Sequence, residues 1–78
     1  MYLLIVNVGG SEAAGRWVIE AVGAKRLTQQ SGNELDFIFD SIDALKAAVT
    51  NVQRLSVRDL VTIPVEMCDD GSWQALLL

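Results

Sequence analysis

The sequence predicts a small α+β domain in which two helices cover one face of an antiparallel sheet. Strand-like segments alternate with two stretches whose apolar residues recur every three or four positions, as in amphipathic helices. Turn-forming residues join neighbouring strand segments at two places, which is typical of hairpins. A chain of 78 residues suffices for one such domain and is too short for two.

The first strand is expected at residues 2–8, a run that is apolar on both alternating sides except at Asn7. Such runs are typical of strands buried on both faces, so we expect this one at the centre of the sheet, covered on both sides. Ser11 is a favourable N-cap for the first helix, and Gly23 is a typical C-terminal stop. The expected core face of this helix contains Ala14, Trp17, Val18, Ala21 and Val22.

A hairpin follows the first helix. Residues 26–30 are short and polar, which favours an edge strand, and the turn Ser31-Gly32-Asn33 leads into residues 34–40. Apolar and acidic residues alternate in that strand. One side is expected to carry Leu35, Phe37 and Phe39, and the other Glu34, Asp36, Ile38 and Asp40.

The second helix is expected after a cap at Asp40 or Ser41. Its apolar stripe comprises Ile42, Leu45, Ala48, Val49, Val52 and Leu55. Residues 60–67 are predicted to be a strand, in which Pro64 implies an edge position or a bulge because proline donates no ladder hydrogen bond.

Asp69-Asp70-Gly71 predicts a second hairpin turn, with a last strand over residues 73–78. The complete order is β-α-β-β-α-β-β. Its first six elements match the split βαβ, ferredoxin-like plan. We expect the C-terminal strand either to extend the sheet edge or to pair across a dimer interface.

The charge balance argues against direct binding of nucleic acid. Six lysines and arginines against ten acidic residues give a net charge of −4, and the six cations are scattered along the chain. Phosphate contact requires a clustered basic face, whereas this excess of acid favours a basic protein partner. A single cysteine, Cys68, fits a reducing cytoplasm, and the apolar start is too short for a signal peptide or a membrane span.

No catalytic or metal-binding constellation is evident, so we expect neither an enzyme nor a bound cofactor. Histidine is absent, and Cys68 stands beside two aspartates that disfavour a reactive thiolate. Asp36 and Asp40 share a strand side and are the best candidates for a carboxylate pair. An enzyme of that type would need a strongly raised pKa at one of them.

A glycine-rich turn precedes the first helix, at Gly9-Gly10-Ser11. It could bind an anion at the helix N-terminus, but its spacing is neither a dinucleotide fingerprint nor a P-loop, and Glu12 would repel an anion. Over residues 1–66, this turn and the elements after it resemble the plan of ACT-type amino-acid-sensing domains. The resemblance implies a small-molecule sensor whose ligand lies near this loop, and this is the alternative function.

The main functional hypothesis is a non-catalytic protein–protein interaction module, homodimeric and directed at a larger basic partner as an inhibitor or adaptor of the phage or mobile-element type. Hydrophobic residues make up 51% of the chain, more than a domain of this size easily buries. The terminal residues 73–78 are apolar on both sides and uncharged, unlike a protected edge strand. The expected contact residues are Trp73, Leu76 and Leu78 together with the acidic Glu34, Asp36, Asp40 and Asp43.

Overall fold

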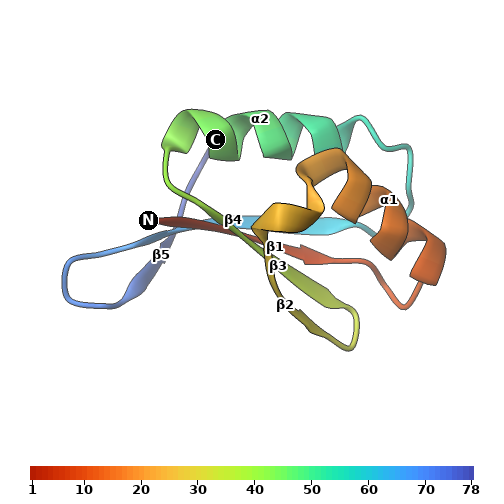
Figure 1. Ribbon diagram of the computed structural model, residues 1–78, viewed down its shortest axis with the longest axis horizontal. Helices are drawn as coiled ribbons and strands as arrows, with labels where there is room; N and C mark the ends of the chain where they lie inside the picture. The colour runs from red at the N-terminus through yellow and green to blue at the C-terminus, as the bar shows by residue number, and fades with distance from the viewer.

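The computed structural model describes residues 1–78 and shows a five-stranded antiparallel sheet beneath two helices (Figure 1). The elements are β1 (Tyr2–Asn7), α1 (Glu12–Val22), the short 3₁₀ helix η1 (Ala24–Arg26), β2 (Leu27–Ser31), β3 (Glu34–Phe39), α2 (Ile42–Gln53), β4 (Val61–Met67) and β5 (Trp73–Ala75). The predicted α+β class is confirmed.

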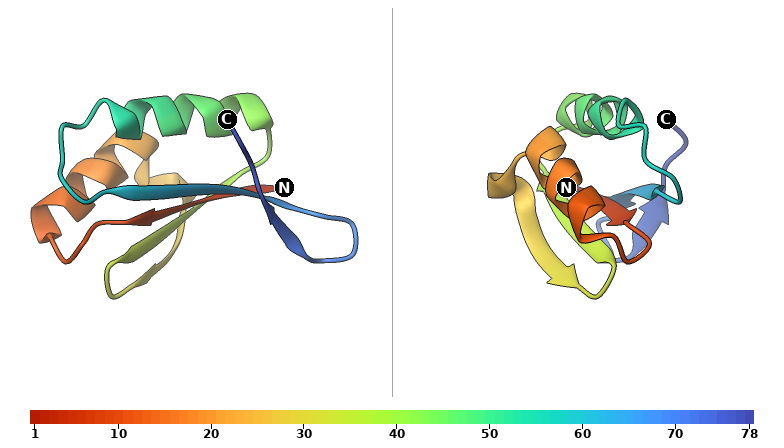
Figure 2. Two further views of the ribbon diagram at one scale, coloured as in Figure 1. Left: turned by 180° about the vertical axis from the view of Figure 1, so that it is seen from behind. Right: turned by 90° about the vertical axis from the view of Figure 1, so that its right-hand side faces the viewer.

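The strands lie in the order β2-β3-β1-β4-β5, and every neighbouring pair is antiparallel. The first four strands and the two helices are compatible with the split βαβ plan, and β5 extends the sheet beside β4 within the same chain. Both helices lie on one face of the sheet (Figure 2). Right-handed crossovers explain this arrangement. The strands of the β1-α1-β2 unit are antiparallel to those of the β3-α2-β4 unit, and the two units move the chain toward opposite edges of the sheet, so both right-handed connections place their helix on the same face.

The helix ends follow the capping residues in the sequence. The Ser11 side chain accepts a hydrogen bond from the backbone N–H of Ala14 at 3.1 Å, and α1 ends at Gly23, where φ is +110°. Ser41 caps α2 in the same way at 3.2 Å, so of the two predicted capping residues it is Ser41, and not Asp40, that caps. The carboxylate of Asp40 therefore takes no part in capping α2.

The core lies between the helices and one face of the sheet. Its largest fully buried side chains are Leu4, Val6, Val18, Leu35, Phe37, Phe39, Leu45 and Val52. The predicted inward side of residues 34–40 is thus confirmed. Each such side chain contributes about 1.5–3 kcal/mol by leaving water, so this layer carries most of the stability.

Trp17 was expected in this core, and that prediction is wrong: its side chain is 50% exposed. The buried positions of α1 are Ala14, Gly15 and Val18, which are small or β-branched. These three positions form a narrow inward stripe centred near Val18, and one residue corresponds to about 100° round the helix. Trp17 follows one step further round the helix and faces outward.

Pro64 lies in β4, and most of the edge of β4 that faces away from β1 has no neighbouring strand. The carbonyl of Pro64 accepts a hydrogen bond of 2.9 Å from the backbone N–H of Leu76 and so points away from β1. Because N and C=O of one strand residue point the same way, the missing N–H of Pro64 costs no bond to β1. β5 pairs only with Val65–Met67, and the edge at residues 61–63 is open, as the proline predicted.

The last strand is shorter than expected. It ends at Ala75, and residues 76–78 leave the sheet and rise toward the level of α2 (Figure 2). Leu76 packs against the core on the way. Leu76 therefore adds to the core from this side, whereas Leu77 and Leu78 stay exposed.

Candidate protein-binding surface

The sheet has a second face that no helix covers, here called the open face. Because Leu4 and Val6 point toward the helices, their neighbours Leu3, Ile5 and Asn7 point the opposite way. The pairing register adds the residues of the other strands that lie beside these three. The open face comprises Leu3, Ile5, Asn7, Gln29, Ser31, Glu34, Asp36, Ile38, Val61, Ile63, Val65, Met67, Trp73 and Ala75.

Most of the open face is apolar. We call its eight large apolar residues the apolar field: Leu3, Ile5, Ile38, Val61, Ile63, Val65, Met67 and Trp73. Val61, Ile63 and Trp73 are 52%, 42% and 46% exposed, respectively. Val65 lies on the same side but is only 7% exposed. A contiguous apolar surface of this kind on a small domain is typical of a contact site.

The sequence predicted that the strand at residues 2–8 would be covered on both sides, and this prediction is wrong for the open face. β1 is central, as expected, but helices cover only one side of it. The right-handed connections place both helices on the same face of the sheet. β1 therefore has the apolar pattern of a strand that is covered on both faces, although this chain covers only one of its faces.

Carboxylates line one border of the apolar field. Glu34 and Asp36 lie on the open side of β3, and Asp40 follows in the bend after the strand, where it lines a cavity beside η1. We call these three residues the acidic column. As the sequence predicted, Leu35 and its alternate neighbours point inward, so Glu34 and Asp36 face away from the core.

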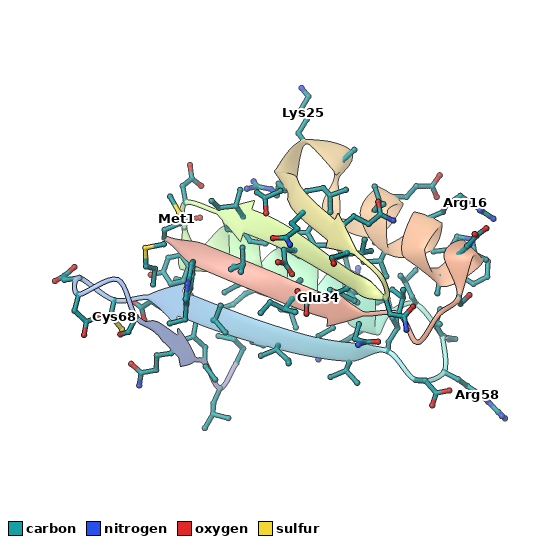
Figure 3. All side chains as sticks on the ribbon, turned by 90° about the horizontal axis from the view of Figure 1, so that it is seen from below. Met1, Arg16, Lys25, Glu34, Arg58 and Cys68 are labelled. Carbon is teal, nitrogen blue, oxygen red and sulfur yellow. The ribbon has the colours of Figure 1, made fainter.

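The strands that form the open face carry no basic side chain to balance these carboxylates. None of the five strands contains lysine or arginine, and all six basic residues belong to helices or connections. Figure 3 views the molecule from the open side: the labelled Arg16, Lys25 and Arg58 project from its periphery, whereas Glu34 lies over the strands. The strands of the open face thus carry apolar and acidic side chains without lysine or arginine, and the cations beside Asp40, at Arg26 and the N-terminus of Met1, lie at one end of the sheet.

Asp36 has the most perturbed environment in the acidic column. Its pKa is raised, first by burial and then by the hydrogen bond and negative charge of Glu34. One carboxyl oxygen, Oδ1, is shielded from solvent and accepts no hydrogen bond. The residues beside it on the neighbouring strands are Ile5 and Gln29, neither of which carries charge. Asp36 is therefore a partly desolvated acid without a counter-ion.

The other expected contact residues are placed differently. Trp73 lies on the open face beside Met67. Leu76 is directed toward the core, whereas Leu77 and Leu78 are exposed beyond it. Asp43 is exposed in the first turn of α2, in the helix layer. Of the seven expected contact residues, the structure gathers Trp73, Glu34 and Asp36 on the open face, and Asp40 lies at its border.

Sequence reasoning missed the apolar field as a surface. Ile63 and Val65 come from a strand whose other side has no large apolar residue, but Leu3 and Ile5 come from a strand that is apolar on both sides. That double apolarity was the available signal. It becomes a surface only once both helices are known to lie on the same face.

The glycine-rich turn borders a polar cavity of about 460 Å³. Gly9 and Gly10 have φ of +62° and +85°, values that favour glycine, so the turn itself requires them. The Ser11 hydroxyl is engaged in capping α1, and Glu12 also lines the cavity. The glycines and the serine are thus explained by local structure.

A larger cavity of about 830 Å³ lies at the other end of the sheet, between η1 and the end of β3. Arg26 spans it: the guanidinium lies 4.8 Å from the ring centroid of Phe39, and Nη1 donates to the carbonyl of Ile38 at 3.4 Å. Asp40 is on the wall. Because Ile38 and Asp40 also border the open face, this hollow adjoins that face.

The structure does not bring together Asp36 and Asp40, the carboxylate pair considered from the sequence. Asp36 and Asp40 are four strand residues apart, so their Cα atoms are separated by about 13 Å. Carboxyl pairs in glycosidases stand about 5–10 Å apart. Asp36 also lines none of the cavities of 830, 460 and 270 Å³. No group of three or more potential ligands is arranged to hold a metal ion, and neither helix has the length and apolar character needed to cross a membrane.

Comparison with known proteins adds no functional evidence. No protein-family model matches the chain, and neither the curated proteins nor the solved structures include a match. Since one fold plan serves many unrelated functions, function is inferred from the residues of the open face.

Proposed function

We propose that this chain is a small, non-catalytic protein-interaction module that binds a basic partner protein through its open face. The observation that supports this most is the pairing of an exposed apolar field with an acidic column and no basic side chain on the strands. Such a surface is complementary to a protein that presents apolar side chains flanked by lysine or arginine. In binding, the module would cover a basic surface of the partner, which suits an inhibitor or an adaptor.

The free energies of burial and of association indicate that the partner must cover the whole apolar field. Burying the exposed halves of Val61, Ile63 and Trp73 would contribute on the order of 2–4 kcal/mol. The loss of translational and rotational freedom on association costs about 4–15 kcal/mol. These three side chains are therefore too few, and the rest of the field and the ion pairs at the acidic column must contribute.

Site-specific photo-crosslinking tests this proposal. A photoreactive amino acid replaces Ile63 on the open face, and in a matched control it replaces Ala47, which is exposed on α2. In the native cell we expect a covalent adduct with a basic protein from position 63 and none from position 47. Equal adduct formation from both positions, or adducts only from position 47, would refute binding through the open face.

A second copy of the chain is a second candidate partner, at a different place. Leu77 is fully exposed and Leu78 half exposed beyond the end of the sheet, which favours self-association through this terminal segment. The open face is less suited to a second copy, because the strands of that copy bring no cation to the acidic column. Sedimentation of the wild type and of the Leu77→Asp plus Leu78→Asp variant tests dimerisation: a dimer that becomes a monomer supports it, and a wild-type monomer refutes it.

The sensing alternative at Gly9-Gly10-Ser11 has weaker support, because the turn and the helix cap account for those residues. Thermal shifts with amino acids and nucleotides test it, since a saturable shift would favour a ligand there. The lone cysteine fits our proposal that the module works in a reducing compartment such as the cytoplasm.

A further inference from the structure

The largest of the three cavities described above takes no part in the proposed function. It has a volume of about 830 Å³ and lies between η1 and the end of β3. Sites for small organic molecules commonly measure about 300–1,000 Å³ and are lined by apolar side chains with a few polar groups. The apolar residues of this cavity are Met1, Val22, Ala24, Ile38 and Phe39, and its charged residues are Lys25, Arg26 and Asp40.

The hollow follows from the way the chain enters β2. α1 ends at Gly23, where φ is +110°, and the next three residues form η1 instead of a strand. β2 therefore begins only at Leu27, opposite Phe37. Ile38 and Phe39 have no partner in β2, so this end of β3 borders a cavity where the rest of the strand borders β2.

One basic side chain is held in place at this cavity. The guanidinium of Arg26 lies 4.8 Å from the centroid of the Phe39 ring, and its Nη1 donates to the carbonyl oxygen of Ile38 at 3.4 Å. A guanidinium has five N–H donors in a planar fork that matches a carboxylate. Its bond to Ile38 uses one of them, so four stay available to a ligand. Because these two contacts already hold the guanidinium, little side-chain freedom is lost when an anion binds.

Cations outnumber acids around this cavity, although the chain as a whole is acidic. Lys25 and Arg26 are the only two basic residues adjacent in the sequence, and Asp40 is the only acidic residue that lines the cavity. Lys25 projects from the periphery of the molecule, so it attracts an anion from outside the cavity (Figure 3). Asp40 is exposed, and water weakens its repulsion of an anion.

We propose that this cavity binds a small amphipathic carboxylate, a molecule with an apolar body that ends in one carboxylate group. The carboxylate pairs with the free donors of Arg26, and the apolar body lies along Val22, Ala24 and Ile38. A ligand cation would meet two like charges here, and a purely polar anion would leave the apolar walls in water. The inference does not depend on a partner protein. Because Ile38 also borders the open face, the ligand lies beside the proposed contact surface.

Titrations followed by NMR test the inference. The probe is 4-phenylbutyrate, and two molecules of similar shape carry a neutral amide (4-phenylbutanamide) or an ammonium group (4-phenylbutylamine) in place of its carboxylate. For a ligand of this size we expect a Kd on the order of 1 mM, with saturating backbone amide shifts at Gly23, Lys25 and Ile38. The carboxylate should bind about fivefold more tightly than the amide, as for a favourable exposed ion pair, and the amine should bind most weakly.

Substitutions of charge at the cavity should act in opposite directions. Arg26→Gln should remove most of the preference for the carboxylate over the amide. Arg54→Gln, the same change of charge at the end of α2, should leave that preference intact. Asp40→Asn should tighten binding of 4-phenylbutyrate by up to about twofold, because a like charge is removed. Glu12→Gln, at the polar cavity beside the glycine-rich turn, should not change it.

Ala24→Trp tests the cavity separately from its charge, and it keeps the inference testable if Arg26→Gln fails to fold. Ala24 is exposed on η1 and lines the cavity, so an indole there fills part of the space without entering the core. We expect this variant to lose binding of both the carboxylate and the amide. A well-dispersed amide spectrum would show that its fold is retained.

Three results would overturn the inference. One is the absence of any saturable shift with 4-phenylbutyrate up to about 10 mM. Another is equal affinity for the carboxylate and the amide. The third is a set of saturating shifts that lies at Gly10 and Ser11, or on the open face, in place of the cavity. None of these results bears on the crosslinking experiment, so the proposed function is tested separately.

Discussion

The two faces of this sheet are built from the same strands, but helices cover one of them and the other is open to solvent. On the helix-covered face, Leu4, Val6 and Phe37 are completely buried. On the open face, Ile63 and Val61 are equally apolar and about half exposed. The comparison shows that an apolar pattern tells which side chains favour burial but does not tell what buries them. On one face the chain supplies the cover, and on the other we infer that a partner does.

The largest expected effect is a loss of stability on the covered face. Phe37→Ala should lower the free energy of unfolding by about 3–5 kcal/mol, because it removes a fully buried ring and leaves a cavity. Denaturant unfolding followed by circular dichroism measures this. A domain of 78 residues has little stability in reserve, and a variant that fails to fold would agree with the prediction. A loss below about 1 kcal/mol would mean that the core is placed wrongly.

The corresponding change on the open face should leave the fold intact. Val61→Thr plus Ile63→Thr keeps β-branched residues and removes apolar surface that is already half in water. We expect the free energy of unfolding to change by less than about 1 kcal/mol. The same variant should lose its adduct in the crosslinking experiment when the photoreactive group is placed at Met67. A large loss of stability would show instead that these side chains are buried within the folded chain.

Asp36→Asn should stabilise the isolated chain at neutral pH by up to about 1 kcal/mol. The pKa of Asp36 is raised in the folded state, so the folded chain binds this proton more tightly than the unfolded chain. The wild type therefore loses stability as pH rises from the unfolded pKa through the folded pKa, and the amide variant does not. The gain should vanish in acid below both pKa values.

Urea unfolding of both proteins across this pH range measures the difference. Asp43→Asn is the matched control, because it lies in the first turn of α2, where a negative charge suits the helix N-terminus. It should show no gain at neutral pH. A gain for Asp43→Asn equal to that for Asp36→Asn would assign the effect to net charge alone.

The smallest expected effect concerns the two tryptophans. Trp17 on α1 and Trp73 on the open face are exposed to similar extents, so acrylamide should quench both in the free chain. The single-tryptophan variants Trp17→Phe and Trp73→Phe separate the two signals. Addition of the partner should protect Trp73 and leave Trp17 accessible. Protection of Trp17 alone would place the contact on the helices.

Much of the fold follows from local sequence signals. The caps at Ser11 and Ser41, the stop at Gly23 and the alternation in β3 each depend on neighbouring residues, and the structure agrees with them. Pro64 pointed to an open edge because its effect on hydrogen bonding is also local.

The failures come from tertiary packing. Trp17 has the spacing of a core residue, yet the inward stripe of α1 is formed by Ala14, Gly15 and Val18, and Trp17 lies outside it. Leu76 was expected at a contact edge, but the chain leaves the sheet there and directs Leu76 inward. Neither outcome is encoded in the periodicity of a single segment.

The candidate surface could be predicted in part. The part of the acidic column within β3 follows from alternation in one strand, so Glu34 and Asp36 lie opposite the buried Leu35 and Phe37 as expected. The apolar field requires the strand order and the placement of both helices on one face. Asp43 is close in sequence to the acidic column and lies in another layer, because the chain turns into α2 between them.

The central claim is that the open face is uncovered in the isolated chain and covered in the complex. The most direct test measures how strongly a soluble nitroxide attenuates the NMR signals of the isoleucine methyl groups. The signals are recorded before and after addition of the partner that the crosslinking experiment identifies. The account predicts strong attenuation at Ile5 and Ile63 in the free chain, and protection of both in the complex. Methyl groups at Ile5 and Ile63 that are already protected in the free monomer, or that stay attenuated in the complex, would contradict it.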